Sequence, residues 1–160
     1  MKAGHLQKVL PEITLLVLAT TTPLRIGVYK EGMLIDERSS ERKTSEMLLP
    51  LLEELMGVYD VKQIIYTRSP GSYMAIKLTY ITLKTIEIVR GIECLGCSTF
   101  ALNDGKPVKA IGNLYFIKEK ETIITKKFEE PVDTSFVLPH SIQDLEVDEE
   151  STPAYLLPAV

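Results

Sequence analysis

The order of apolar segments predicts an α/β fold, in which helices cover a five-stranded mixed sheet and a small β-hairpin appendage follows. Three observations indicate this fold class. A β-branched, leucine-rich run opens the chain, a two-residue turn separates the next two runs, and two helix-length segments then alternate with short apolar runs. A three-strand meander followed by helix, strand, helix and strand places antiparallel and parallel strands in one sheet.

Three strands are predicted at the start of the chain, over residues 13–19, 24–30 and 33–39. The first is an uninterrupted apolar run, as expected of a central strand that is buried on both faces. Glu31 and Gly32 separate the second run from the third, and a two-residue connection with Gly in second place is a strong hairpin signal. The three strands are therefore expected to be antiparallel.

Two helices are predicted next, each followed by a strand; the four segments are residues 45–56, 61–67, 72–90 and 92–96. Thr44 is the expected N-cap of the first helix and Gly57 its expected end. Pro50 lies inside this helix and is expected to kink it, because proline removes a backbone donor. Gly91 is expected to end the second helix.

The sequence pattern changes after Asn103. Residues 113–118 and 121–127 are predicted to form a small hairpin. Residues 131–150 are punctuated by proline and acidic near their end, and are expected to form an extended or mobile tail. We therefore expect an N-terminal lobe over residues 1–103, and a reduced second lobe with an acidic tail over residues 104–160.

The composition limits the classes of function. A chain of 160 residues with 45% hydrophobic side chains can bury one sizeable core. The formal net charge of -4 argues against a chain that holds nucleic acid by itself, so tRNA is expected only through a complex. No apolar run reaches the roughly 18 residues of a membrane span, which predicts no membrane contact and a cytoplasmic location.

Side chains that could carry catalysis are sparse. The two histidines, His5 and His140, lie in the two expected tails, and neither a phosphate-binding glycine motif nor a metal-binding motif occurs. We therefore expect no enzyme activity, metal or cofactor on this chain. The turn before the second helix could bind an anion or nucleotide through Ser69, Gly71 and Ser72, although an ordinary strand-to-helix turn is the simpler interpretation.

Both helices carry more apolar surface than one core requires. In the first helix the apolar side chains sweep about 200°, and in the second they form two stripes about 160° apart. One stripe can face the sheet, and the other needs a second cover, from the rest of this chain or from a partner. The candidate partner contacts are Glu46, Leu49, Leu52, Met56, Tyr73, Ile76, Lys77 and Tyr80.

Several short motifs resemble the TsaB (YeaZ) family. Residues 15–25, 35–38 and 44–55 resemble its opening, including a Ser-Glu-x-Leu-Leu-Pro helix start. Residues 69–77 are similar to its GPGSFTGLR segment, and residues 95–102 stand where the family has a similar apolar stretch. A Pro-x-Tyr-Leu sequence at residues 153–156 resembles the family's terminus.

The resemblance implies an actin/Hsp70-like (ribonuclease H-like) fold and a role in making threonylcarbamoyladenosine on tRNA. In that system a TsaD-type subunit carries the metal and the transfer chemistry, a TsaE-type ATPase cycles the complex, and TsaB is a dimerisation platform. ATP and metal are thus implied for the partners. TsaB contacts TsaD, or a second copy of itself, through the first two helices of its N-terminal lobe.

This chain departs from the family at the first turn, where Ala19-Thr20-Thr21 replaces Asp-Thr-Ser and removes a carboxylate that related ATPases use with magnesium. Autonomous ATP hydrolysis is therefore not expected. Two alternatives stay open. One is a homodimer without a role in tRNA modification, and the other is a small thiol-redox protein that uses Cys94 and Cys97.

Overall fold

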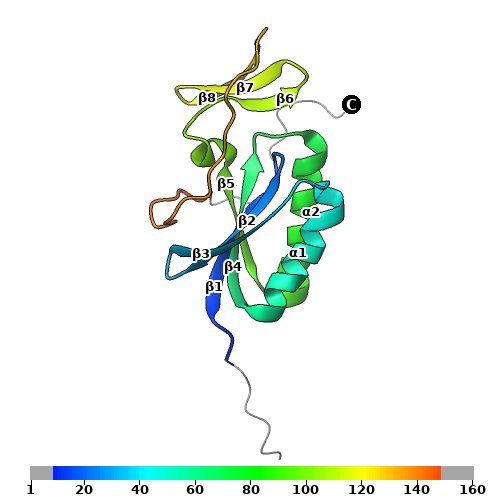
Figure 1. Cartoon of the computed structure of the whole chain (residues 1–160), viewed down its shortest axis with the longest axis vertical. Helices are drawn as coiled ribbons and strands as arrows, with labels where there is room; N and C mark the ends of the chain where they lie inside the picture. The colour runs from blue at the N-terminus through cyan, green and yellow to red at the C-terminus, as the bar shows by residue number, and fades with distance from the viewer. Residues whose placement is uncertain (1–8, 149–160) are drawn as a thin grey trace, which may run out of the picture.

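The computed structural model describes residues 9–148, which form a main lobe and a smaller sheet (Figure 1). The main lobe contains β1 (Glu12–Leu18), β2 (Leu24–Lys30), β3 (Met33–Ser40), α1 (Thr44–Val58), β4 (Asp60–Ser69), α2 (Tyr73–Arg90) and β5 (Glu93–Ser98). A 3-10 helix, η1 (Thr99–Leu102), leads to β6 (Val108–Ile111), β7 (Leu114–Glu119) and β8 (Thr122–Lys127).

The main sheet has the strand order β3-β2-β1-β4-β5. β2 pairs antiparallel with both β1 and β3, whereas β4 pairs parallel with β1 and β5. The predicted α/β fold with a five-stranded mixed sheet is therefore confirmed. β1 lies between β2 and β4 in this sheet. Every one of its residues from Leu15 onward is fully buried, as expected of a central strand.

Both helices lie side by side on one face of the main sheet (Figure 1). The helical face of the core contains Ile13, Leu15 and Val17 of β1, packed against helix residues such as Leu52 and Leu83. Alternate side chains of a strand point to opposite faces, so Leu16 and Leu18 belong to the other face of the sheet.

The helix boundaries differ from prediction in α1 and agree in α2. Lys43, not Thr44, is the N-cap of α1 and makes no side-chain capping bond. Gly57 lies inside the helix, which ends at Val58 with Tyr59 as its C-cap. In α2, Ser72 accepts a hydrogen bond from Ala75 N at 3.2 Å, and Gly91 adopts the left-handed conformation that ends the helix.

The predicted extended or mobile tail includes residues 136–148, which we call the strap, and these residues are packed against the main sheet. The strap has no helix or strand, but it crosses the second face of the main sheet and covers it. Leu138 is buried there, and Phe136, Ile142 and Leu145 pack around it. Apolar side chains in an irregular segment have no periodicity. The sequence pattern therefore did not predict that this segment covers the sheet.

Backbone bonds hold the strap at its middle and at Asp148. Leu34 N donates to His140 O at 2.8 Å, and Ile142 N donates to Gly32 O at 2.9 Å, which ties the strap to the β2–β3 hairpin. At the opposite edge of the sheet, Asp148 N donates to Gly96 O at 2.7 Å. The rest of the predicted tail, from Glu149 on, lies outside the described residues.

The late hairpin has one more strand than predicted. β6 joins β7 and β8 in a three-stranded antiparallel sheet of order β6-β7-β8, so the appendage is a small sheet and not a hairpin alone. Its inner face packs Val108 and Phe116 against Phe100 of η1 and Phe136 of the strap. β6 is short and follows a proline, which leaves little alternation for a sequence pattern to show.

Candidate partner interface

The two rows of α2 have opposite roles. Ile76, Thr79, Leu83 and Ile86 are buried and face the main sheet. The opposite side of the helix carries four exposed apolar side chains that we call the outer row: Met74 (68% exposed), Ile81 (51%), Ile88 (74%) and Val89 (72%). Their spacing places them within about 100° of each other over about 22 Å of helix.

The structure therefore corrects two of the sequence-predicted contacts. Ile76 is 3% exposed and Leu52 is 0% exposed, so both belong to the core of this chain and cannot contact a partner. Met56 packs at the border of the helical core, and Tyr73 and Tyr80 are half-buried. The apolar stripe that the sequence assigned to a partner is thus largely the stripe that faces the sheet.

Three predicted contacts do lie at the surface. Leu49 of α1 is 46% exposed, and Lys77 and Glu46 are exposed as well. Glu46 pairs with Arg42 at 3.3 Å across one turn, where both side chains are at least half exposed. Together with the outer row, Leu49 gives the helical layer an apolar exterior that a single globular chain rarely leaves open.

The outer row was visible in the sequence as a stripe, but its outward orientation was not. Met74, Ile81, Ile88 and Val89 recur at helical spacing, as do the residues of the buried row. Both rows are apolar, so hydrophobicity alone could not decide which of them faces the sheet.

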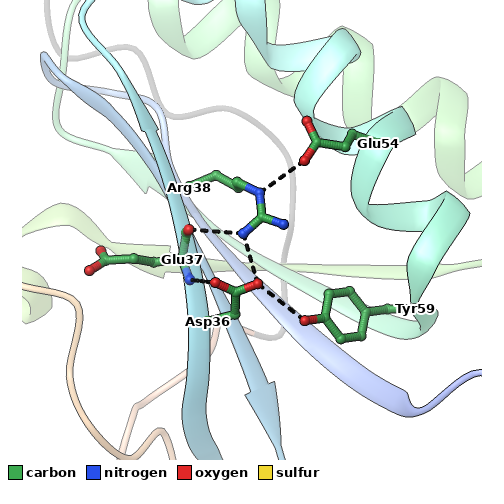
Figure 2. A network of polar contacts seen from close by, with 5 residues as sticks. All are labelled: Asp36, Glu37, Arg38, Glu54 and Tyr59. Carbon is green, nitrogen blue, oxygen red and sulfur yellow. Dashed lines mark hydrogen bonds and ion pairs between the residues drawn. The ribbon is translucent and has the colours of Figure 1, made fainter.

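A polar network fixes α1 against β3 on the side of the helical layer (Figure 2). Arg38 of β3 contacts Asp36 at 2.7 Å and reaches Glu54 of α1 at 3.0 Å. Tyr59, at the end of α1, donates to the same Asp36 oxygen at 3.2 Å. The network therefore joins the C-terminal half of α1 to β3.

The same network shifts the titration of its members. The hydrogen bond from Arg38 lowers the pKa of Asp36 below its usual value. Partial burial, followed by the hydrogen bond to Asp36, raises the pKa of Tyr59. Asp36 is therefore a carboxylate and Tyr59 a neutral donor at neutral pH, which is the pairing that the network requires.

The turn of Ser69, Gly71 and Ser72 packs tightly against the end of β1. A Cβ on Gly71 would lie 2.7 Å from Thr20 Cβ and 3.0 Å from Thr20 O, so glycine is required for this close approach. Thr20 Oγ1 in turn donates to Thr67 Oγ1 at 2.9 Å. Buried hydroxyls thus join the segment after β1 to β4, next to the turn.

A cavity of about 420 Å³ opens beside this turn and the start of α2. Ser72 lines it, whereas Ser69 and Gly71 do not. The other lining residues come from the β1–β2 connection, the starts of α1 and α2, β6, the segment before the strap and the first residue of the strap: Ala19, Thr20, Thr21, Thr22, Thr44, Ala75, Lys109, Ala110, Thr134 and Phe136. Six of these eleven described lining residues carry a hydroxyl group, and none of the eleven carries a carboxylate.

The two cysteines lie on opposite faces of the main sheet. Cys94 belongs to the helical core and Cys97 to the strap-covered core. Three residues of extended strand separate their Cα atoms by about 10 Å, which is beyond the roughly 7 Å that a disulfide permits. Burial raises the pKa of each thiol to about 12, so neither is a reactive thiolate at neutral pH.

No cluster of three metal-ligating side chains occurs among residues 9–148. Within the same range, neither helix is long and apolar enough to cross a bilayer.

Comparison with known proteins places the fold. No protein-family model matches the sequence, and no curated protein matches it. Among solved structures, the chain is similar to YeaZ from Pseudomonas aeruginosa, with a TM-score of 0.60 and 13% identity over 79% of this chain and 72% of that one. A second solved structure, an uncharacterized protein with similarity to peptidase YEAZ from Pseudomonas aeruginosa, gives a TM-score of 0.56 and 14% identity.

The alignment with the second structure covers 73% of this chain but only 64% of the other, less than two thirds of its length. The class of protein that the fold defines is an α/β protein with a five-stranded mixed sheet. Within that class, the chain has the TsaB (YeaZ)-like fold that its motifs predicted.

Proposed function

We propose that this chain is a non-catalytic assembly subunit of the complex that makes threonylcarbamoyladenosine on tRNA. It docks onto a TsaD-type catalytic subunit through the outer faces of α1 and α2. The metal and transfer chemistry belong to that partner, and a TsaE-type ATPase is a further partner of the assembled complex. The subunit acts in the cytoplasm, where this tRNA modification takes place.

The observation that carries the proposal is the outer row of α2. Four large apolar side chains on one side of a helix, each more than half exposed, favour a protein partner that removes them from water. Burying each such side chain contributes about 1.5–3 kcal/mol before the costs of association are counted. The YeaZ-like fold and the matching motifs support a TsaD-type subunit as this partner.

Lys77 adds a positive charge beside the exposed apolar side chains of α2. It is exposed on α2, and its position on the helical wheel is next to the outer row. Rim charges steer association and select partners more than they add affinity. A complementary acidic rim is therefore expected on the TsaD-type subunit.

Co-purification tests the proposal directly. The chain is co-expressed with the TsaD-type subunit of the same genome, as wild type, as Ile81→Glu and as Val137→Glu. Val137 is a matched control because it is an exposed apolar side chain, 65% accessible, that lies on the strap. We expect the wild type and the control to co-elute with the partner, and Ile81→Glu to lose co-elution while it stays folded.

Three outcomes decide against the proposal. One is no co-elution of the wild type together with unchanged tRNA modification after deletion of the gene. The second is co-elution that Ile81→Glu leaves intact, which places the contact elsewhere. The third is a wild-type homodimer by light scattering that Ile81→Glu dissociates, with no binding to the catalytic subunit, which supports a stand-alone homodimer.

A further inference from the structure

The cavity beside the start of α2 is walled by the main lobe on one side and by β6 of the small sheet on the other. Its volume of about 420 Å³ falls within the roughly 300–1,000 Å³ of pockets that bind small molecules. Ala19, Ala75 and Ala110 line it with methyl groups only, which leaves this space open. Phe136 is half-buried and adds an aromatic wall. The cavity can therefore take a small molecule with a polar and an apolar part.

Four threonines that line the cavity have hydroxyl groups without a hydrogen-bond partner in the part of the chain that the structure describes. Thr21 and Thr22 belong to the β1–β2 connection, Thr44 begins α1, and Thr134 precedes the strap. A hydroxyl group both donates and accepts hydrogen bonds. Three segments that are far apart in the sequence thus bring free hydroxyl groups to one cavity, where a bound molecule can use them.

The charges around the cavity favour an anion. Lys109 of β6 is the one charged residue among the described lining residues, and within the same part of the chain it forms no ion pair. Both helices begin on the side of the main lobe that carries the small sheet, and helix N-termini carry a partial positive charge (Figure 1). Glu46, in the first turn of α1, lies outside the lining and is paired with Arg42. A chain with a net charge of -4 thus contains a cavity whose lining is positive.

A phosphate group suits this set of donors better than a carboxylate does. A carboxylate presents two oxygens in one plane, whereas a phosphate monoester presents three acceptor oxygens around a tetrahedral centre. The lining donors come from the β1–β2 connection, the start of α1, β6 and the segment before the strap, so they surround the space instead of sharing a plane. Lysine binds phosphate as a point charge and needs no second fixed contact. The lining offers no carboxylate for a divalent metal, which predicts binding without Mg²⁺.

We propose that this cavity binds a small organic phosphate, of the monoester class, without a divalent metal. Lys109 pairs with the phosphate group, the free threonine hydroxyls donate hydrogen bonds to its oxygens, and Phe136 packs against the organic part. The inference goes beyond the proposed docking function, because no residue of the outer row lines the cavity.

The test uses phenyl phosphate as the probe, because it joins a phosphate monoester to a ring that can pack on Phe136. Its binding to the full chain is measured by isothermal titration calorimetry, once with EDTA and once with Mg²⁺. Benzoate and inorganic phosphate are titrated in parallel, to separate the ester from a carboxylate and from free phosphate. No partner subunit is present, so failure of this test is distinct from a failure of docking to the TsaD-type subunit.

Two variants remove single contacts and a third is a matched control. Lys109→Met should weaken the binding of phenyl phosphate at least about tenfold, because it removes a charge-assisted hydrogen bond. Thr134→Val removes one hydroxyl with little change of shape and should weaken binding about threefold to tenfold. Lys118→Met should bind as the wild type does, with or without Mg²⁺, since Lys118 is exposed on β7 of the same sheet but does not line this cavity. Unchanged melting temperatures without ligand confirm that each variant is folded.

Other results overturn the inference. These are absence of binding by the wild type at millimolar phenyl phosphate, an equal loss in Lys118→Met, or unchanged affinity in both Lys109→Met and Thr134→Val. Equal affinity for benzoate would make the cavity a general anion site, and equal affinity for inorganic phosphate would assign it to free phosphate. Either result removes the organic phosphate as the ligand. Binding that requires Mg²⁺ would contradict the metal-independent contact.

Discussion

The two faces of the main sheet are buried by different means. On one face, α1 and α2 contribute regular rows of apolar side chains, and Leu52 and Leu83 are almost completely inaccessible. On the other face, an irregular strap contributes Leu138 and three half-buried neighbours. Burial of apolar area does not depend on secondary structure, so a segment without a repeat completes the core as a helix does.

The exteriors of the two regions also differ. The helices that cover one face carry exposed apolar side chains, whereas residues 106–128, which include the small sheet, contain six lysines and two glutamates. An apolar exterior of this kind fits a protein partner that removes it from water.

The largest effect is expected on the helical face. Leu52→Ala removes a fully buried side chain from α1 and should lower the free energy of unfolding by about 2–5 kcal/mol, because the helix cannot close the cavity. Denaturant unfolding measures the change. A loss below about 1 kcal/mol would mean that α1 repacks and is not a fixed layer.

Leu138→Ala makes the same test on the strap. Leu138 is 6% exposed, so we expect a loss of about 2–3 kcal/mol within a single cooperative transition. Hydrogen exchange of Leu34 N and Ile142 N, which bond the strap to the hairpin, provides a local readout. If global stability is unchanged and these two amides exchange quickly, the strap detaches independently and the two faces are not equivalent.

The two thiols allow the two faces to be compared in one protein, because Cys94 is buried in the helical face and Cys97 in the strap-covered face. Because burial raises the pKa of Cys97 from 9.0 to about 12, its folded form retains a proton that the unfolded form loses in that window. Stability should therefore fall as pH rises above 9, by up to about 1.4 kcal/mol per pH unit for this thiol.

Alkylation of the native protein checks the same pair at neutral pH. Both thiols should resist labelling until the chain is unfolded, as intact mass would show. Faster labelling of Cys97 than of Cys94 would indicate that the strap opens more often than the helices. Rapid labelling of both thiols would instead support the alternative of a thiol-redox protein.

The smallest effects are expected from the ion pairs on each side. Arg38→Ala breaks the network below α1, and Arg68→Ala breaks the 3.0 Å pair with Asp148 at the end of the strap. These partly exposed pairs should each contribute about 0.2–1 kcal/mol, measured by denaturant unfolding. A loss above about 2 kcal/mol for either would show that the pair carries far more of the fold than its exposure indicates.

The pH dependence of the Arg38 network follows from Asp36. The pKa of Asp36 is lowered in the folded state, so its contribution is present at neutral pH and is lost as pH falls through the acidic range below its usual value. Asp36→Asn should flatten this acid limb slightly. An unchanged acid limb would mean that the network contributes nothing to folding.

Local patterns were sufficient for the first lobe. Glu31-Gly32 gave the hairpin, and Ser72 and Gly91 gave the bounds of α2, because turn and cap preferences act within a few residues. Thr44 and Gly57 gave wrong bounds for α1, because the helix begins one residue earlier than predicted and ends two residues later. The strap and β6 were missed because neither has a periodic pattern.

The sequence by itself determined that α2 has two apolar rows, that the chain folds as an α/β lobe, and that its motifs resemble those of TsaB. Only the tertiary structure decided that Ile76 faces the sheet and Met74 faces out, and that Lys109 and Ser72 line one cavity. The physical reason is that periodicity fixes which residues share a side of an element. Which side is covered depends on what the rest of the chain places there.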